Sequence, residues 1–257
     1  MEKYKLVTSE NFPNCKDVFH TEDMFNILAG PCAIESEAEL NLIAKALSAN
    51  NVKVFRGGAY KPRSSPYDFQ GLGFEGVKIM KEVCDRYSLC SVSEVMDVRD
   101  IEILMDYIDV FQIGSRNMSN TVLLKEMGKT KKPILLKRGY MATLEEFLMA
   151  AEYIVSNGNN NIVLCERGIR TFETSTRNTL DISTVAIIKK ITALSVIVDL
   201  SHSLGRKDII LPVAKAIREL GADGIMLEVH NNPPKALSDS EQQLSIEEFQ
   251  CFHDAFR

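Results

Sequence analysis

The chain has 257 residues, 45% of them hydrophobic and 25% charged, a composition typical of a globular protein with a large core. Its net charge of -5 argues against a general nucleic-acid-binding protein, because such proteins need a broad basic surface. No apolar run approaches the roughly 18 residues of a membrane span, no signal peptide is evident, and the six cysteines form no CxxC pair, so the sequence predicts a cytoplasmic protein with reduced thiols.

The segment 1–24 is polar and mixed, and we expect it to form a short N-terminal extension, with a strand at 4–7 and the rest at the surface. From residue 25 onward, short apolar runs alternate with longer amphipathic stretches. The apolar runs, which we predict to be strands, are 25–29, 52–55, 89–92, 110–113, 134–136, 162–165, 196–200 and 225–229.

Each predicted strand is followed by a stretch whose apolar residues recur at helical spacing. These predicted helices are 37–49, 74–86, 100–107, 120–127, 144–155, 182–191, 209–220 and 246–252. Repeated strand–helix units without a linker predict a single (β/α)8 TIM barrel over residues 25–257, with no separate regulatory domain. A doubly wound open sheet is the alternative, although no G-x-G-x-x-G fingerprint follows the first strand.

In either architecture the residues just after the strands gather at one face, which carries the functional site. Charged or metal-binding side chains follow nearly every predicted strand: Cys32, Arg56, Lys61, Arg63, Glu94, Arg116, Lys137, Glu166, Arg167, Asp199, His202, Glu228 and His230. Converging charges cost free energy unless a ligand or metal ion neutralises them, so the pattern predicts a binding or catalytic site.

Anions are one expected ligand of this site. The loop 55–73 is rich in glycine and cations, and arginine forks, lysine and backbone N–H groups all bind phosphate or carboxylate. Six strand-end cations would suit two phosphate groups and a carboxylate: Arg56, Lys61, Arg63, Arg116, Lys137 and Arg167. Alternatively, these cations form structural ion pairs with Glu94, Asp97, Glu166 and Asp199.

A divalent metal ion is the other expected ligand. Cys32, His202 and Glu228 all follow strands, and Asp239 lies in the long loop after the eighth strand. A thiolate, an imidazole and carboxylates suit Zn, Fe, Mn or Co with a coordination position left open. No short spacing motif supports this site, so Cys32 could instead be a core residue, His202 a general base and Glu228 an ion-pair partner.

Eight segments of the chain, in order and with matching spacing, resemble 3-deoxy-D-arabino-heptulosonate 7-phosphate (DAHP) synthases of the branch that includes 3-deoxy-octulosonate 8-phosphate synthases. The segments are 30–36, 56–65, 112–117, 132–139, 165–168, 199–203, 227–230 and 236–239. The resemblance implies a barrel that condenses phosphoenolpyruvate with erythrose 4-phosphate and releases phosphate, at the entry to aromatic amino acid (shikimate) biosynthesis.

The resemblance also implies roles for individual residues. Cys32, His202, Glu228 and Asp239 would hold one divalent ion, which would act as a Lewis acid. Contacts to phosphoenolpyruvate would come from Arg116, Lys137 and Arg167 at its phosphate and from Arg56 and Lys61 at its carboxylate. Arg63 and Ser64 would hold the aldose phosphate, and proton transfer would fall to Lys137, Glu94 or His202.

Three alternatives to this activity remain open at the level of sequence. The sister reaction uses arabinose 5-phosphate, although Lys-Pro-Arg-Ser at 61–64 differs from the Ala-Asn-Arg sequence typical of that enzyme. A Schiff-base aldolase would use Lys137 without a metal, and a non-catalytic barrel would only bind phosphosugars. The resemblance further implies a dimer or tetramer, and the short segments at both ends lead us to expect a catalytic core without built-in feedback control.

Overall fold

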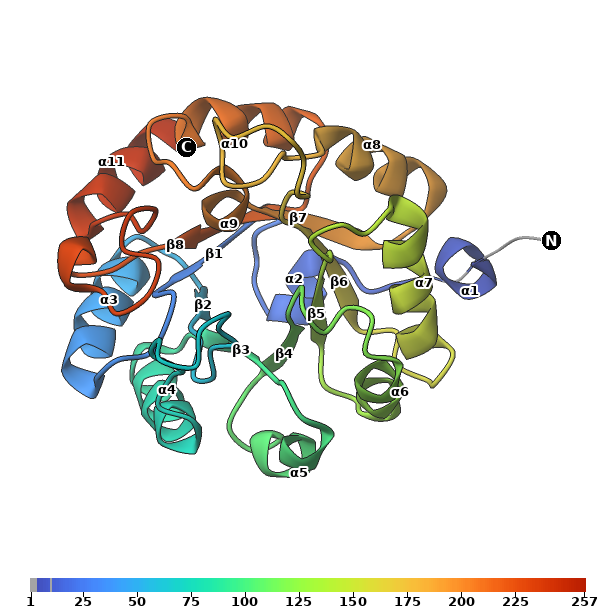
Figure 1. Cartoon of the computed structure of the whole chain (residues 1–257), viewed down its shortest axis with the longest axis horizontal. Helices are drawn as coiled ribbons and strands as arrows, with labels where there is room; N and C mark the ends of the chain where they lie inside the picture. The colour runs from blue at the N-terminus through green and yellow to red at the C-terminus, as the bar shows by residue number, and fades with distance from the viewer. Residues whose placement is uncertain (1–3, 10) are drawn as a thin grey trace.

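The computed structural model describes residues 4–9 and 11–257, in which parallel strands close into a barrel surrounded by helices (Figure 1). The strands are β1 (Asn26–Gly30), β2 (Val54–Arg56), β3 (Cys90–Glu94), β4 (Val110–Ile113), β5 (Ile134–Lys137), β6 (Ile162–Glu166), β7 (Ser195–Asp199) and β8 (Gly224–Glu228). Because β1 also pairs in parallel with β8, the sheet has no free edge. The predicted barrel is confirmed, and the open sheet is excluded.

Most helices lie where the apolar spacing predicts them. They are α1 (Lys5–Ser9), α2 (Cys15–Phe19), α3 (Glu37–Ala49), α4 (Phe74–Tyr87), α5 (Ile101–Leu104), α6 (Thr121–Lys129), α7 (Leu144–Val155), α8 (Ile182–Ile191), α9 (Leu200–Leu204), α10 (Ile210–Glu219) and α11 (Ile246–Phe256). The helix predicted at 100–107 is shorter, because a 3-10 turn over Val98–Asp100 leads into the four residues of α5. None of the helices in the described ranges is long and apolar enough to cross a membrane.

The N-terminal segment departs from its prediction in two places, and residues 1–3 and 10 of it lie outside the described residues. The strand predicted at 4–7 is wrong, because the N–H groups of Leu6 and Val7 donate to the carboxylate of Glu152 in α7 and start the helix α1. The prediction that the rest of this segment lies at the surface is wrong at α2, where Cys15, Val18 and Phe19 are buried.

Helix α2 packs inside the barrel rather than on its outside. Cys15, Val18 and Phe19 belong to the same buried cluster as the inward-pointing apolar side chains of the strands, and Figure 1 shows α2 at the centre of the ring. The helix therefore closes the amino end of the barrel, opposite the end that carries the expected site.

The strands carry a polar layer directly above an apolar one. Side chains at alternate strand positions share a face, and the inward apolar layer is Leu28, Val54, Val92, Val110, Leu135, Val163, Ile197 and Met226. Two positions further along the same strands stand Gly30, Arg56, Glu94, Gln112, Lys137, Cys165, Asp199 and Glu228. The period of the strand therefore delivers several of the predicted site residues to the carboxyl end of the barrel.

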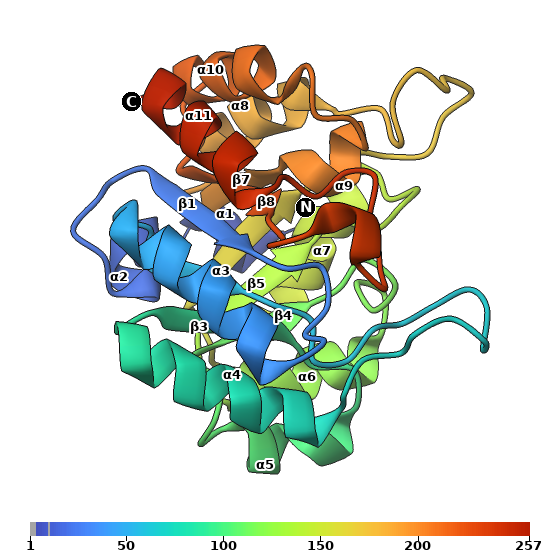
Figure 2. The same ribbon diagram turned by 90° about the vertical axis from the view of Figure 1, so that its left-hand side faces the viewer.

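Two long loops extend from that end. They are 57–73, between β2 and α4, and 167–181, between β6 and α8, and Figure 2 shows both projecting from the same side of the molecule. The first is the predicted anion-binding loop 55–73 without its first two residues, which end β2, and the second begins at Arg167.

Candidate active site

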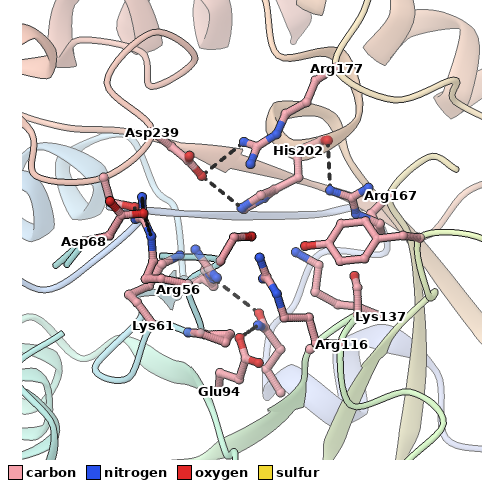
Figure 3. A pocket seen from close by; sticks show the side chains of 18 residues that line it. Arg56, Lys61, Asp68, Glu94, Arg116, Lys137, Arg167, Arg177, His202 and Asp239 are labelled. Carbon is pink, nitrogen blue, oxygen red and sulfur yellow. Dashed lines mark hydrogen bonds and ion pairs between the residues drawn. The ribbon is translucent and has the colours of Figure 1, made fainter. Parts of the chain in front are cut away.

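A cavity of about 170 Å³ opens at the carboxyl end of the barrel (Figure 3). Its lining includes seven lysine and arginine side chains: Arg56, Lys61, Arg63, Arg116, Lys137, Arg167 and Arg177. Ser64, Glu94, His202 and Asp239 also line it, whereas Cys32 and Glu228 lie buried just outside the lining. All residues to which the family resemblance assigns a role are therefore gathered at one place.

The four predicted metal ligands form a compact group. One ligand atom from each of Cys32, His202, Glu228 and Asp239 lies within 4.8 Å of all the others. His202 Nε2 is 3.2 Å from Glu228 Oε1 and 3.7 Å from Asp239 Oδ2, and Cys32 Sγ is 3.3 Å from the same Asp239 oxygen. A thiol, an imidazole and two carboxylates at this separation are a donor set suited to a borderline divalent ion.

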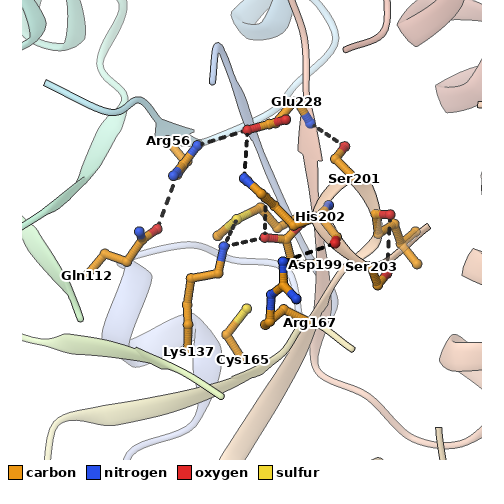
Figure 4. A network of polar contacts seen from close by, with 12 residues as sticks. Arg56, Gln112, Lys137, Cys165, Arg167, Asp199, Ser201, His202, Ser203 and Glu228 are labelled. Atoms are coloured by element: carbon orange, nitrogen blue, oxygen red, sulfur yellow. Dashed lines mark hydrogen bonds and ion pairs between the residues drawn. The ribbon is translucent and has the colours of Figure 1, made fainter. Parts of the chain in front are cut away.

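Asp199 fixes the orientation of His202 (Figure 4). It caps the short helix α9 by accepting from the His202 backbone N–H at 3.0 Å, and its Oδ2 lies 2.8 Å from His202 Nδ1. Burial lowers the pKa of His202 to about 4, despite the opposing effect of Asp199 and Glu228, so the ring is neutral near pH 7. With its proton on Nδ1, the ring directs the Nε2 lone pair at two carboxylates, an arrangement that fits a cation between them.

The surroundings of Cys32 favour the protonated thiol. Burial raises its pKa to about 12, and the nearby Glu228 carboxylate adds to the shift. Its Sγ accepts from Lys61 Nζ at 3.0 Å and lies 3.1 Å from Ser238 Oγ. A divalent ion would displace the thiol proton and bind the thiolate, and Lys61 would then stabilise the negative sulfur.

Arg56 lies at the bottom of the cavity, where its side chain is only 2% exposed. Its guanidinium forms a 3.3 Å ion pair with Glu228 and donates to Gln112 Oε1 at 3.2 Å. The backbone of β1 leaves room for Arg56 because Gly30 has a φ of 152° and a Cβ there would lie 2.2 Å from the Arg56 carbonyl oxygen. Arg56 is thus fixed in place before any ligand binds.

The alternative of structural ion pairs applies to only part of the cation set. Lys137 does pair with Asp199, but Asp97 pairs with the exposed Arg99. Glu166 pairs with Arg138 rather than with a cation of the cavity. Within the ranges 4–9 and 11–257, Arg116 and Arg167 have no carboxylate partner, so their charges remain available to a ligand.

Arg138 shows how the fold keeps Arg167 unpaired. The Arg138 guanidinium lies 2.8 Å from Glu166 and 3.0 Å from Asp181, so it neutralises the carboxylates just before loop 167–181 and at its end. Arg167 is 1% exposed, donates only to the backbone oxygens of Gly168 and His202 among described residues, and has a buried Nε without a partner. An unpaired buried guanidinium is expected where an anion binds.

The predicted aldose-phosphate residues lie on the opposite wall. Arg63 donates to Ser238 Oγ at 2.8 Å and pairs with the exposed Asp68 at 3.2 Å, while Ser64 is exposed at the rim. Ser238 therefore connects Arg63 to the sulfur of Cys32. Figure 3 shows Arg116, Lys137 and Arg167 across the cavity from Asp68, the carboxylate partner of Arg63.

Glu94 has an unused acceptor in the cavity. Its Oε2 accepts from Gln112 Nε2 at 3.3 Å, but its buried Oε1 has no partner among the described residues. The Glu94 carboxylate fits here because residue 114 is glycine. A Cβ at residue 114 would lie 2.0 Å from Glu94 Oε1. A buried, unsatisfied carboxylate oxygen is placed to accept a proton from a water or hydroxyl group.

The cavity lining also includes Tyr140, Arg177 and Ser238, to which the sequence analysis gave no role. Arg177 lies late in loop 167–181 and pairs with Asp239 at 3.1 Å. Burial opposes the ionisation of Asp239, but His202, Arg177 and Lys61 hold its pKa below its ordinary value. Of the strand-end candidates, His230 does not reach the cavity, because its ring faces Glu35 at 3.8 Å. Of Tyr140, Arg177 and Ser238, only Ser238 had a sequence signal, because it lies in the motif 236–239.

Comparison with known proteins identifies one family. A family model described as the DAHP synthetase I family matches residues 7–256. The chain is 50% identical over 254 residues to the phospho-2-dehydro-3-deoxyheptonate aldolase of Thermotoga maritima, covering 97% of this chain and 75% of that protein. It is also 28% identical over 242 residues to the 2-dehydro-3-deoxyphosphooctonate aldolase of Geobacter sulfurreducens, covering 86% of this chain and 87% of that one.

Solved structures show the same relationship. A crystal structure of phospho-2-dehydro-3-deoxyheptonate aldolase (DAHP synthase) from Thermotoga maritima matches with a TM-score of 0.92 and 47% identity, over 99% of this chain and 76% of that one. A truncated form of 3-deoxy-D-arabino-heptulosonate 7-phosphate synthase from the same organism matches with a TM-score of 0.88 and 44% identity, over 98% and 94% of the two chains.

Proposed function

The chain belongs to the DAHP synthetase I family, and we propose that it condenses phosphoenolpyruvate with D-erythrose 4-phosphate and water to give DAHP and phosphate. The reaction is the first step of aromatic amino acid (shikimate) biosynthesis. One observation carries the proposal: a single cavity lined by seven lysine and arginine side chains lies against a group of four residues that could hold a metal ion. This arrangement matches two phosphorylated substrates that react with each other over a metal ion.

Phosphoenolpyruvate is assigned to the wall with Arg116, Lys137 and Arg167, which would bind its phosphate. Its carboxylate would reach Arg56 and Lys61 at the bottom of the cavity, next to the metal ligands. Arg63 and Ser64 at the opposite rim would bind the phosphate of erythrose 4-phosphate. The two anchored phosphates would align the reacting carbons, which lowers the entropic cost of the condensation.

The metal site is assigned to Cys32, His202, Glu228 and Asp239, with Mn, Fe, Zn or Co as candidates. When bound, the ion would supply Lewis acidity toward the aldehyde oxygen of the aldose. The chain's own part is to hold the ligand atoms in place, because Asp199 fixes His202 and Arg56 fixes Glu228.

Proton transfer is assigned to groups that line the same cavity. Carbon 3 of phosphoenolpyruvate attacks the aldehyde, water adds at carbon 2, and the resulting hemiketal phosphate loses phosphate. Glu94 Oε1 is placed to accept a proton from the water, because it is buried and has no partner among the described residues. Lys137 Nζ is a cation held by Asp199 and can donate a proton to a departing phosphate oxygen.

The ion pair of Lys137 argues against the Schiff-base alternative. A Schiff base needs a free amine as the nucleophile, whereas Lys137 Nζ is held in an ion pair with the buried Asp199 carboxylate. Borohydride reduction in the presence of phosphoenolpyruvate and aldose should therefore leave the protein unmodified.

A phosphate-release assay tests the proposal directly. The purified chain is mixed with phosphoenolpyruvate and either erythrose 4-phosphate or arabinose 5-phosphate, before and after treatment with a chelator. We expect turnover with erythrose 4-phosphate that the chelator abolishes and that added divalent metal restores. Absence of turnover with erythrose 4-phosphate would overturn the proposal, and turnover with arabinose 5-phosphate alone would assign the sister reaction.

We also propose a cytoplasmic homo-oligomer, a dimer or tetramer. All six cysteines are free thiols in the structure, as is typical of a reducing compartment. Large apolar side chains are exposed on the loops around the cavity, with Tyr67 at 95%, Phe172 at 96% and Met141 at 78%, and burial between copies would remove them from water. Light scattering coupled to size-exclusion chromatography measures the mass, and a monomer at micromolar concentration would contradict the oligomer.

A further inference from the structure

Three guanidinium groups surround the ring of Tyr140 on the Arg116 and Arg167 wall of the cavity. The guanidinium carbons of Arg116, Arg167 and Arg170 lie 5.4, 4.7 and 4.5 Å from the centre of the ring. All three distances are within the roughly 6 Å over which the negative face of an aromatic ring attracts a cation. One ring therefore contacts both arginines assigned to the phosphate of phosphoenolpyruvate.

Tyr140 holds this position because its backbone is tied to the loops on both sides. Its carbonyl oxygen accepts from the Arg170 N–H at 2.7 Å, which joins it to the loop after β6. The preceding Gly139 N–H contacts the sulfur of Met118 at 3.0 Å, which joins it to the loop after β4. The ring is thus placed between the segments that supply its arginine neighbours.

The partners of these arginines differ from those of other cations in the molecule. Arg63, Arg138 and Arg177 each pair with carboxylates, which neutralise their charge. In the ranges 4–9 and 11–257, no ion pair joins Arg116, Arg167 or Arg170 to a carboxylate. Burial lowers the pKa of Arg167, as expected for a cation whose charge is poorly compensated.

We propose that Tyr140 is a positioning residue for the phosphate group of phosphoenolpyruvate, acting through Arg116 and Arg167. A carboxylate would steady a guanidinium but would also cancel its charge and compete with the substrate phosphate. An aromatic ring restricts the guanidinium and leaves its charge and its N–H donors available. Arg170, at the exposed side of the ring, adds a third positive charge that attracts a doubly charged anion toward the pocket.

The inference rests on the proposed function, but a direct measurement of anion binding tests the role of Tyr140 separately from the condensation activity. Tyr140→Leu removes the ring at similar volume, Tyr140→Met is a second variant with an unbranched side chain, and Tyr140→Phe keeps the ring without the hydroxyl. Calorimetry measures the affinity of each for phosphoenolpyruvate and for inorganic phosphate, alongside KM and kcat. Tyr153→Leu is the matched control, because its ring lies 5.8 Å from Lys125 Nζ on the outer helices, away from the cavity.

We expect Tyr140→Leu and Tyr140→Met to weaken binding of phosphoenolpyruvate roughly tenfold and to raise its KM similarly. The KM of the aldose and kcat should change less than about twofold, and Tyr140→Phe and Tyr153→Leu should match wild type. Wild-type affinity in a folded Tyr140→Leu or Tyr140→Met variant would overturn the inference, as would equal damage by Tyr140→Phe. If the wild-type protein does not condense the two substrates, the proposed function is wrong, but the affinities of the variants for inorganic phosphate still test the role of Tyr140. If the wild-type protein binds neither phosphoenolpyruvate nor inorganic phosphate, both the proposed function and the role of Tyr140 are wrong.

Discussion

Lys137 and His202 are joined through one oxygen of Asp199. Asp199 Oδ2 accepts from Lys137 Nζ and lies 2.8 Å from His202 Nδ1. Burial alone would raise the pKa of Asp199, but His202 and Lys137 hold it well below its ordinary range. A residue proposed for proton transfer and a residue proposed to bind metal therefore share one buried, ionised carboxylate.

Replacement of Asp199 by Asn should damage both functions at once. The amide cannot carry the negative charge that holds Lys137. It also has one acceptor oxygen, whereas Asp199 uses both of its oxygens, Oδ1 for the His202 backbone N–H and Oδ2 for Lys137 Nζ. We expect metal affinity to fall roughly 10- to 100-fold, as for other residues that orient a metal-binding histidine, and kcat to fall by at least the same factor at saturating metal. Metal affinity is measured by titration of the chelated protein, and kcat by phosphate release.

The matched control for this substitution is Asp223→Asn. Asp223 also pairs with a lysine, Lys189 at 2.8 Å, and accepts from a strand N–H, but it precedes β8 and therefore lies at the opposite end of the barrel. Asp223→Asn should lower stability without changing metal affinity. Equal loss of metal in the two variants would show that a general structural effect, and not the shared oxygen, explains the result.

The barrel could be predicted because its signals are local and repeated. Each strand is buried on both faces, so it appears as an apolar run, and the amphipathic helices between the strands have a clear period. The helices α1, α2 and α9 were missed because five residues are too few to show that period. Their formation depends on tertiary partners, such as Glu152 for α1 and the barrel interior for α2.

The candidate site could be predicted as far as residues follow strands directly. Glu94, Lys137 and Glu228 stand two positions after inward apolar residues, so the strand period alone brings them together. Tyr140 and Arg177 reach the cavity through the course of loops, which no periodicity encodes. The sequence also could not show that Glu166 faces Arg138 instead of the cavity, because both residues are at strand ends.

Cys32 gives a spectroscopic test of the proposed metal ligands. Cobalt(II) bound by a thiolate has a strong charge-transfer absorbance in the near ultraviolet, so wild type should show this band on titration with Co²⁺. Cys32→Ser should lose the band and bind Co²⁺ at least tenfold more weakly, because a hydroxyl is a poorer ligand. Cys251→Ser, which removes an exposed thiol, is the control and should keep the band. A band unchanged in Cys32→Ser would place the metal elsewhere.

Arg63 should distinguish the two substrates. Loss of a charge-assisted contact costs about 1.5–3 kcal/mol, so Arg63→Ala should raise the KM of erythrose 4-phosphate roughly 10- to 100-fold. The KM of phosphoenolpyruvate should change less than about threefold, because the cations assigned to its phosphate lie across the cavity from Asp68, the partner of Arg63. Initial rates measured with each substrate varied in turn give both values, with Arg99→Ala as an exposed control. Similar increases for the two substrates would contradict the separate assignment.

Asp181 should make the stability of the barrel depend on pH at acidic values. It caps α8 and contacts Arg138 at 3.0 Å and Thr184 Oγ1 at 2.7 Å. Burial opposes its ionisation, but hydrogen bonds from Ser183, Thr184 and Arg138 outweigh this and lower its pKa to about 2. Because the pKa is lower in the folded chain than the roughly 3.9 of an unfolded one, the ionised carboxylate stabilises the fold above about pH 4 and this contribution disappears as the pH falls toward 2.

Asp181→Asn isolates this charge, since asparagine is an equally good helix cap. The shift would correspond to about 2.5 kcal/mol if fully buried, but the side chain is 27% exposed and solvent screens it, so we expect a loss of about 1 kcal/mol at pH 7. Urea unfolding at pH 7 and pH 3 measures the difference from wild type, which should shrink at pH 3 because Asp181 of the unfolded chain, with its higher pKa, is mostly protonated there. Asp254→Asn, at the surface of α11, is the control. A difference that stays constant between the two pH values would show that Asp181 acts through hydrogen bonding and not through its charge.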